Sequence, residues 1–247
     1  MLAYAAMMTG QSELAVQHIR AMVEGIPLDF VKEHAAIAES FVGLPYEVLI
    51  RFGRWDDILT APDHPDFMPL TRAMRFAARG IALAAKGDIA GAKLEQQAYL
   101  AAVPLVPPEQ TAGPDTRQAI LPVVTPMLAG EILYREGRRD EGLAKLREAV
   151  KAEDALRYSE PPDWILPARH SLGAALMQER RFAEAEQVYR DDLARLPENG
   201  WSLFGLAQSL HRQGKEEEAA ATDARFQKIW SKADVQIKSS CLCQPGI

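Results

Sequence analysis

The chain has 247 residues, of which 48% are hydrophobic and 25% are charged, and its formal net charge at pH 7 is -6. This composition is typical of a soluble globular protein, and the length allows one large domain or two small ones. The acidic balance, without any basic stripe, argues against a nucleic-acid-binding surface, and no apolar run is long enough to cross a bilayer. We therefore expect no nucleic-acid partner and no membrane insertion.

The N-terminal segment, residues 1–27, predicts a pair of helices. Its start, MLAYAAMMTGQS, is apolar but lacks the positive leader of a signal peptide, so we interpret it as a helix and expect a cytoplasmic location. Gly10 marks the turn to a second helix, which Pro27 ends. Relative to a full helical repeat, about five residues are missing before Met1. Either the chain is the C-terminal part of a longer array, or its first helix is one turn short.

Two further helix pairs follow. Residues 46–52 predict a helix that turns at Gly53 into a second helix starting near Trp55, which later prolines cut short. Residues 72–104 predict two alanine-rich helices joined at Gly87, and their small side chains allow close packing.

Between residues 105 and 122 the helical pattern disappears. We expect an irregular crossing there, which separates an N-terminal half, residues 1–104, from a C-terminal half, residues 123–233. The residues that break the pattern are Pro107, Pro108, Gly113, Pro114 and Pro122.

The C-terminal half resumes the alternation of helix and turn. Turns are predicted at Gly137, Arg180 and Gly214. The helix after Gly214 has charged residues along one side, and such a polar outer face is what the last unit of a helical stack requires.

Residues 234–247 are predicted to form a polar tail that contains the only two cysteines, Cys241 and Cys243. They are too close together for an ordinary structural disulfide framework. A Cys-x-Cys pair can bind a soft metal, but a structural site normally needs four ligands and the five histidines are scattered along the chain. We therefore predict no metal and no cofactor.

Residues 166–199 carry the clearest repeat signal, in the sequence LPARHSLGAALMQERRFAEAEQVYRDDLARLPEN. Gly173 and Ala185 fall where two helices approach most closely, and Tyr189 adds an apolar face. Pro197 then ends the second helix. At these spacings the chain resembles the tetratricopeptide repeat proteins. It is also similar, in the phrases RFGRWDDIL, EPPDW and NGWSLFGL, to a group of bacterial repeat proteins of unassigned role.

This resemblance implies an all-α solenoid of about six helical hairpins, stacked into a right-handed superhelix. Proteins of the family are scaffolds that hold a peptide or a partner protein in the inner groove. Two positions depart from the family pattern: Arg169 stands where Trp is frequent, and Asp192 stands where Ala is usual.

The same repeat geometry selects the side chains that face the groove. In the first half these include Tyr4, Glu47 and Arg51. In the second half we expect Arg135 and Arg212 to pair with a carboxylate of the partner. For each charged residue, the alternative is a solvated helix face. The predicted partner-binding residues are Glu131, Tyr134, Arg135, His170, Gln178, Phe204, Gln208, His211 and Arg212.

Within this set, Tyr134, Arg135, His211 and Arg212 are predicted to form a cluster, because Arg and Tyr are favoured at binding hot spots. We expect His211 to make binding depend on pH between about pH 5 and 8.

An enzymatic alternative rests on His170, with Glu160 and Asp163 on the preceding loop. A histidine oriented by a carboxylate is the minimum for general base catalysis, and it would allow hydrolase-like chemistry. No nucleophile elbow, zinc-protease motif or glycine-rich phosphate loop accompanies it. The sequence therefore favours a non-enzymatic interaction scaffold.

Overall fold

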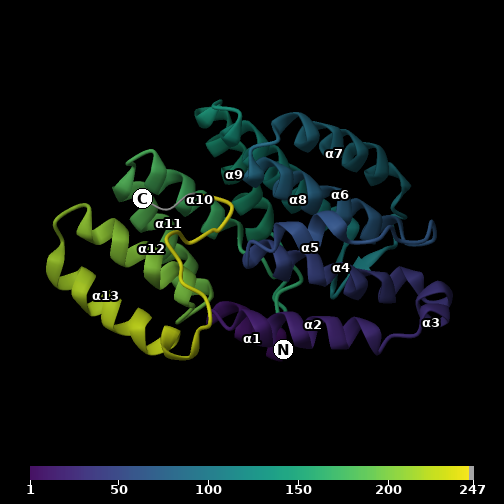
Figure 1. Ribbon diagram of the computed structural model, residues 1–247, viewed down its shortest axis with the longest axis horizontal. Coiled ribbons are helices and arrows are strands. Elements are labelled where there is room, and N and C mark those ends of the chain that lie inside the picture. Colours follow the sequence, from purple (N-terminus) through teal and green to yellow (C-terminus); the bar gives the residue numbers. More distant parts are fainter. Residues whose placement is uncertain (245–247) are drawn as a thin grey trace.

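A computed structural model describes residues 1–244, and the chain there is almost entirely helical (Figure 1). Consecutive helices form six packed pairs. The pairs are α1 (Leu2–Met8) with α2 (Ser12–Glu24), α4 (Ala35–Arg51) with α5 (Trp55–Thr60), α6 (Pro69–Lys86) with α7 (Ile89–Ala102), α8 (Arg117–Arg135) with α9 (Arg139–Asp154), α10 (Ala168–Gln178) with α11 (Phe182–Arg195), and α12 (Gly200–His211) with α13 (Glu216–Ile229).

The predicted turn positions are confirmed. At every turn between paired helices, the backbone enters the left-handed region that glycine adopts without steric cost. The turn between α10 and α11 is the one without glycine, and Arg180, with φ of 57°, takes the left-handed position there. The other turn residues are Gly10, Gly53, Gly87, Gly137 and Gly214.

Two helices begin earlier in the chain than the sequence-based analysis predicted. α4 begins at Ala35, not at residue 46, after the short α3 (Leu28–Glu33). α8 begins at Arg117, inside the segment expected to be irregular, and it contains Pro122 and Pro126. Most of its side chains from Ile120 onward are buried, so tertiary packing outweighs the local cost of proline.

The remaining irregular segment holds a small hairpin. η1 (Val103–Leu105) is followed by β1 (Thr111–Ala112) and β2 (Asp115–Thr116), which pair antiparallel with Thr111 opposite Thr116. We predicted no β-structure, and this hairpin is the only exception within residues 1–244. The all-α class is confirmed. None of the described helices is both long enough and apolar enough to span a membrane.

One hydrophobic cluster joins residues from both sides of the crossing, and α6 packs directly against α8. The proposed division at residues 105–122 stays a prediction. Within α10 and α11, a Cβ on Gly173 would lie 2.5 Å from Cε1 of Tyr189, and a Cβ on Gly205 in α12 would lie closer still to Cζ of the same ring. Tyr189 therefore packs between two glycines, which explains why both positions lack a side chain.

The two ends of the array contact each other. The indole of Trp201 in α12 donates a hydrogen bond to the carbonyl of Met7 in α1, at 2.8 Å. After η2 (Trp230–Lys232), the Asp234 carboxylate accepts hydrogen bonds from the amides of Ser12 and Glu13. An Asp at this place satisfies free amides at the start of α2, in the manner of an N-cap. The first helix pair is therefore joined to the last, as Figure 1 shows.

The chain after Asp234, predicted as a polar tail, packs against the helices and is buried at its end. It runs back across α10 and α12 toward the centre of the molecule (Figure 1). The buried residues at its end are Ser239, Ser240, Cys241, Cys243 and Gln244. The last three residues of the predicted tail, 245–247, lie outside the described residues.

Candidate functional site

The inner face of the helix pairs holds the chain's own C-terminal segment, residues 238–244, which we call the tail segment. Two arginines from distant helices bind its backbone. Arg51 of α4 donates to the carbonyl of Ser240 at 3.0 Å, and Arg135 of α8 donates to the carbonyl of Cys243. Carbonyl oxygens are present in every peptide, so these contacts recognise the backbone, here in a turn closed by the amide of Gln244 on the carbonyl of Cys241, and not a particular side chain.

The side chain of Ser240 is also held. Its hydroxyl donates to the carbonyl of His170 at 2.9 Å. The same oxygen lies 2.7 Å from the hydroxyl of Tyr189, which must then be the donor in that contact. All three groups are buried. The site therefore fits a small polar side chain at this position of the bound segment.

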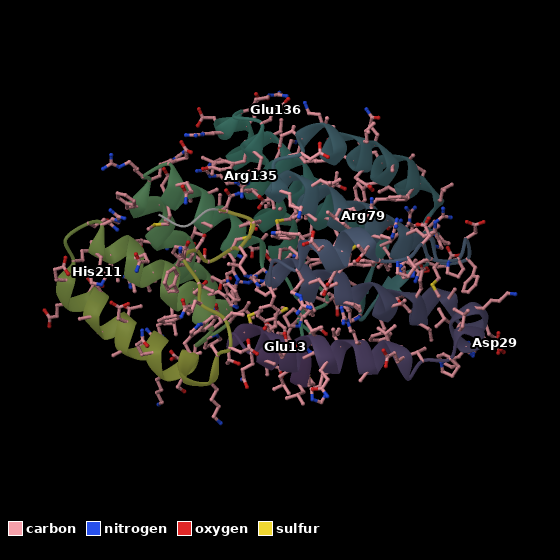
Figure 2. The ribbon with its side chains drawn as sticks, in the orientation of Figure 1. Glu13, Asp29, Arg79, Arg135, Glu136 and His211 are labelled. Atoms are coloured by element: carbon pink, nitrogen blue, oxygen red, sulfur yellow. A yellow bond between two sulfur atoms is a disulfide. The ribbon has the colours of Figure 1, made fainter. Side chains whose placement is uncertain are left out.

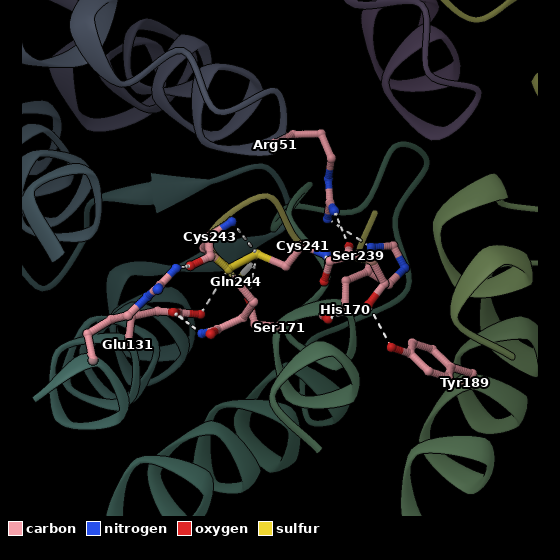
Figure 3. Close-up of a disulfide and its surroundings, with 11 residues drawn as sticks. Arg51, Glu131, His170, Ser171, Tyr189, Ser239, Cys241, Cys243 and Gln244 are labelled. Atoms are coloured by element: carbon pink, nitrogen blue, oxygen red, sulfur yellow. Dashed lines mark hydrogen bonds between the residues drawn. A yellow bond between two sulfur atoms is a disulfide. The ribbon is translucent and has the colours of Figure 1, made fainter. Parts of the chain in front are cut away.

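The two cysteines form a disulfide with each other inside the groove (Figure 3). This corrects the expectation that their spacing disfavours a disulfide. Cys243 Sγ lies 3.1 Å from Oε1 of Glu131, and Gln244 Nε2 donates to Oε2 of the same carboxyl group at 2.8 Å. Burial raises the pKa of Glu131 to about 7, although Arg135 opposes the shift.

Behind the tail segment, a buried polar chain links α4, α10 and α11. Arg51 Nη2 lies 2.8 Å from Nδ1 of His170, and His170 Nε2 lies 2.9 Å from Oδ2 of Asp192. Arginine has no acceptor atom, so Nδ1 of His170 must be the acceptor and its proton must sit on Nε2. His170 is thus a neutral imidazole that donates to Asp192 and accepts from Arg51; Figure 3 shows the contact with Arg51.

The ionisation states agree with this arrangement. Burial lowers the pKa of His170, and the neighbouring Arg51 charge lowers it further, although Asp192 opposes both. Burial alone raises the pKa of Asp192, but His170, Ser202 and Asn199 outweigh that effect and hold it below its usual value. Ser202 Oγ and Asn199 Nδ2 each donate a hydrogen bond to Oδ2 of Asp192, at 2.7 Å and 3.0 Å respectively. The Asp192 carboxylate is therefore charged, and its Oδ2 is bound by His170, Ser202 and Asn199.

Arg51 completes this centre. Burial lowers its pKa to about 9, so the guanidinium remains charged at neutral pH. It lies over the ring of Trp201, 4.6 Å from the centroid, where the ring face attracts a cation. Arg51 thus connects the tail segment to both the buried His170 and the indole that joins the two ends of the array.

Six of the nine predicted partner-binding residues lie along the tail segment. Glu131, Arg135 and His170 contact it directly. A hollow of about 10 Å³ beside Ser240 is lined by other residues of the set, and this is near the smallest volume that admits one water. The tail segment therefore leaves little free space beside these residues. The residues that line the hollow are Gln178, Phe204 and Gln208.

The predicted hot-spot cluster does not form. Tyr134 is buried and its hydroxyl donates to Glu179 at 2.7 Å. His211 and Arg212 are exposed, and His211 contacts Glu216 and Asp223 on α13. Figure 2 shows Arg135 and His211 on different parts of the molecule. The prediction failed because the ends of α8 and α12 belong to pairs that are not neighbours in the array.

The proposed pairing of His170 with Glu160 or Asp163 does not form either. His170 is fully buried, and both of its ring nitrogens are engaged with Arg51 and Asp192. Asp163 instead accepts a hydrogen bond from the amide of Asp115. The carboxylate that orients His170 is the one at position 192.

Glu160 and Asp163 line a cleft of about 770 Å³, whose lining also includes Asp192, the carboxylate that binds His170. It lies between α1, the end of α9 and the loop before α10. Two buried polar atoms of residues in its lining, the Tyr4 hydroxyl and Nε1 of Trp164, have no hydrogen-bond partner among the described residues.

Sequence reasoning missed the tail segment as a ligand of the groove. A signal was available only for the polar chain behind it: Asp192 lies on a packed helix face, and a buried charged residue requires partners. No protein-family model matches the chain, and no curated protein matches it significantly.

Proposed function

We propose that this protein is a non-enzymatic interaction scaffold whose inner groove binds an extended peptide of a partner protein. In this proposal the tail segment occupies the groove when the partner is absent. The observation that carries the proposal is the pair of hydrogen bonds from Arg51 and Arg135 to backbone carbonyls of the tail segment. A groove that holds one segment through its backbone carbonyls is suited to hold another.

A tetratricopeptide-like arrangement is part of the proposal. It is supported by the six consecutive helix pairs, by the left-handed turn residues between them, and by the packing of Tyr189 between Gly173 and Gly205. A solenoid of this type offers a preformed wall, so a bound peptide orders without much reorganisation of the scaffold.

The groove also restricts which peptide fits. Ser240 occupies a closed site between His170 and Tyr189, so the partner needs a small residue there. Four residues later, Glu131 accepts from an amide side chain. We propose a partner peptide with a small polar residue, followed four positions later by Gln or Asn. Arg135 then pairs with a backbone carbonyl in place of the carboxylate expected from sequence.

The test is displacement of the tail segment. A variant that ends at residue 237 should bind a labelled peptide of residues 236–247, while the full-length chain should bind it at least about tenfold more weakly, because its own tail competes at a high effective concentration. Fluorescence anisotropy measures both affinities. Replacing Arg135 by Gln in the shortened chain should weaken binding, whereas replacing the exposed Arg212 should not.

A full-length Ser240→Tyr variant provides a second route to an empty groove, because the larger side chain cannot fit beside His170. It should bind the labelled peptide more tightly than the parent. If both variants remain helical by circular dichroism and neither binds the peptide, the groove is not a peptide-binding site.

A further inference from the structure

The tail segment and α8 bring together four side chains with metal-binding atoms. The Sγ atoms of Cys241 and Cys243 and a carboxylate oxygen of Glu131 all lie within 4.8 Å of one another, and all three residues are buried. Gln244, also buried, lies against the same carboxyl group. We propose that these four residues bind a zinc ion when the disulfide is reduced.

The second observation that supports this site is an unpaired acceptor. The side chain of Gln244 uses its Nε2 to bind Glu131, but its Oε1 is buried and has no hydrogen-bond partner among residues 1–244. A buried carbonyl oxygen without a partner carries a desolvation cost, which a cation beside it would remove. Gln244 thus supplies a fourth ligand next to the two sulfurs and the carboxylate.

The ligand set selects the metal. Thiolates favour soft or borderline ions and disfavour magnesium and calcium, while two oxygen ligands suit zinc, which accepts Cys and Asp/Glu ligands in a tetrahedral site. Two thiolates and one carboxylate carry three negative charges. Zinc supplies two positive charges, and Arg135, bound to the carbonyl of Cys243, supplies the third. The assembled site is therefore close to neutral, which favours its burial.

Reduction must come first, because disulfide sulfurs are not thiolate ligands. An external dithiol transfers two electrons and two protons to the Cys241–Cys243 bond and is itself oxidised to a disulfide. Zinc then displaces the two thiol protons as it binds. The sulfurs move apart to about 3.8 Å, as a tetrahedral site with Zn–S bonds of about 2.3 Å requires. The disulfide form and the zinc form exclude each other.

The site has one ligand on the groove wall and three on the tail segment. Zinc would therefore fasten the tail segment to α8 and make it harder to displace. This consequence rests on the proposed peptide-binding function, whereas the metal site itself does not. In a reduced, zinc-loaded chain we expect the groove to be closed to a competing peptide.

The test uses the full-length protein, reduced with a phosphine under an inert atmosphere and titrated with Co²⁺ as a spectroscopic probe and then with Zn²⁺. We expect one equivalent to bind and to produce a thiolate-to-cobalt charge-transfer band that zinc abolishes. The unreduced protein should show no such band. Absence of the band in the reduced protein overturns the proposal.

Three variants define the ligands. Glu131→Gln and Gln244→Ala should each weaken zinc binding by about 10- to 100-fold, and Cys243→Ser should abolish the charge-transfer band. The matched control is Glu136→Gln, at the end of the same helix and paired with Lys93 outside the site, which should leave the affinity within twofold. Equal affinities for the parent and Glu131→Gln would show that the two cysteines alone hold the metal, and would overturn this site.

The peptide-binding proposal and the zinc-site proposal can be disproved independently of each other. The chain that ends at residue 237 lacks both cysteines, and its binding to the oxidised peptide is measured with a metal chelator present, so it tests the groove without any metal. If that chain binds peptide and the reduced full-length chain binds no zinc, only the metal site is wrong. If zinc binds as expected but neither the chain that ends at residue 237 nor the Ser240→Tyr variant binds the peptide, only the peptide-binding function is wrong.

Discussion

Both ring nitrogens of His170 are used inside the protein, one toward a cation and one toward an anion. This arrangement leaves no free atom for proton transfer to a substrate. It also makes the imidazole a bridge between Arg51 and Asp192, two charged groups that are both buried. Removing the imidazole of His170 deprives the buried charges of Arg51 and Asp192 of a hydrogen-bond partner that water cannot replace.

We therefore predict that His170→Ala lowers the free energy of unfolding by about 3 to 5 kcal/mol. The matched control is His211→Ala, whose side chain contacts two carboxylates at the surface. It should change the free energy of unfolding by no more than about 0.5 kcal/mol. Urea denaturation followed by circular dichroism measures both. A His170→Ala variant as stable as the parent would contradict the buried bridge.

The carboxyl group of Glu47 should make the free energy of unfolding depend on pH. It is buried, and its Oε2 accepts from the amide of Ile165 at 2.8 Å. Burial raises the pKa of Glu47 to about 8, although the amides of Ile165 and Leu166 oppose the shift. The folded chain therefore keeps a proton on Glu47 over a pH range in which the unfolded chain, with the ordinary pKa near 4.5, releases it.

Because folding raises the pKa of Glu47, the stabilisation that comes from its protonated form is complete below pH 4.5 and is lost as the pH rises toward 8. The loss amounts to about 1.4 kcal/mol per pH unit. Glu47→Gln keeps an oxygen for the amide of Ile165 but cannot ionise. Its stability relative to the parent should therefore rise between pH 5 and pH 8, as measured by urea denaturation at each pH. An equal pH profile for Glu47→Gln and for the exposed control Glu217→Gln would show that Glu47 ionises normally.

At the scale of elements, the spacing between α10, α11 and α12 depends on Tyr189. Its ring fills the space that side chains at positions 173 and 205 would need. The hydroxyl at the far end of the ring then reaches Ser240 of the tail segment. One tyrosine therefore couples the packing of two helix pairs to the bound segment.

We predict that Gly173→Ala destabilises the protein by about 1 to 3 kcal/mol, because the added Cβ would lie 2.5 Å from the tyrosine ring. The matched control is Gly43→Ala in α4, where the added Cβ would meet Met74 at an ordinary 3.7 Å. That variant should be as stable as the parent or up to about 1 kcal/mol more stable, because alanine favours helix. Thermal denaturation compares the two. Equal melting of both variants would mean that Tyr189 has room to move.

At the scale of the whole molecule, contacts between the first and last helix pairs join the ends of the array. Trp230 packs edge-on against Trp201, with the ring centroids 5.3 Å apart, and lies so close to Gly10 and Gly200 that neither can carry a Cβ. A repeat protein with free ends unfolds unit by unit from its termini. Joined ends should make the unfolding of this chain more cooperative.

Trp230→Ala should remove this junction at a cost of about 3 kcal/mol or more. We expect the amides of α1 and α2 to lose protection from hydrogen exchange before those of α8, whereas in the parent both exchange together. Leu94→Ala, on the exposed side of α7, serves as the control and should exchange like the parent. Unchanged protection of α1 and α2 in Trp230→Ala would show that the junction does not couple the ends.

The sequence by itself determined the helices and the turns between them. Left-handed backbone strongly favours glycine, so Gly10, Gly53, Gly87, Gly137 and Gly214 could be placed as turns from local chemistry alone. Apolar residues at three- and four-residue steps then identified the packed faces. Local rules failed for α8, because its prolines are tolerated only through packing against helices that are distant in sequence.

Only the tertiary structure decided what the groove contains. Arg51, Arg135 and the tail segment are far apart in the chain, and nothing in their local sequence shows that they meet. The sequence predicted a polar tail around Cys241, and burial of polar groups is unfavourable unless each one finds a partner. Those partners exist only once α4, α8 and α10 are assembled, so the position of the tail segment depends on the whole fold and on no short stretch of sequence.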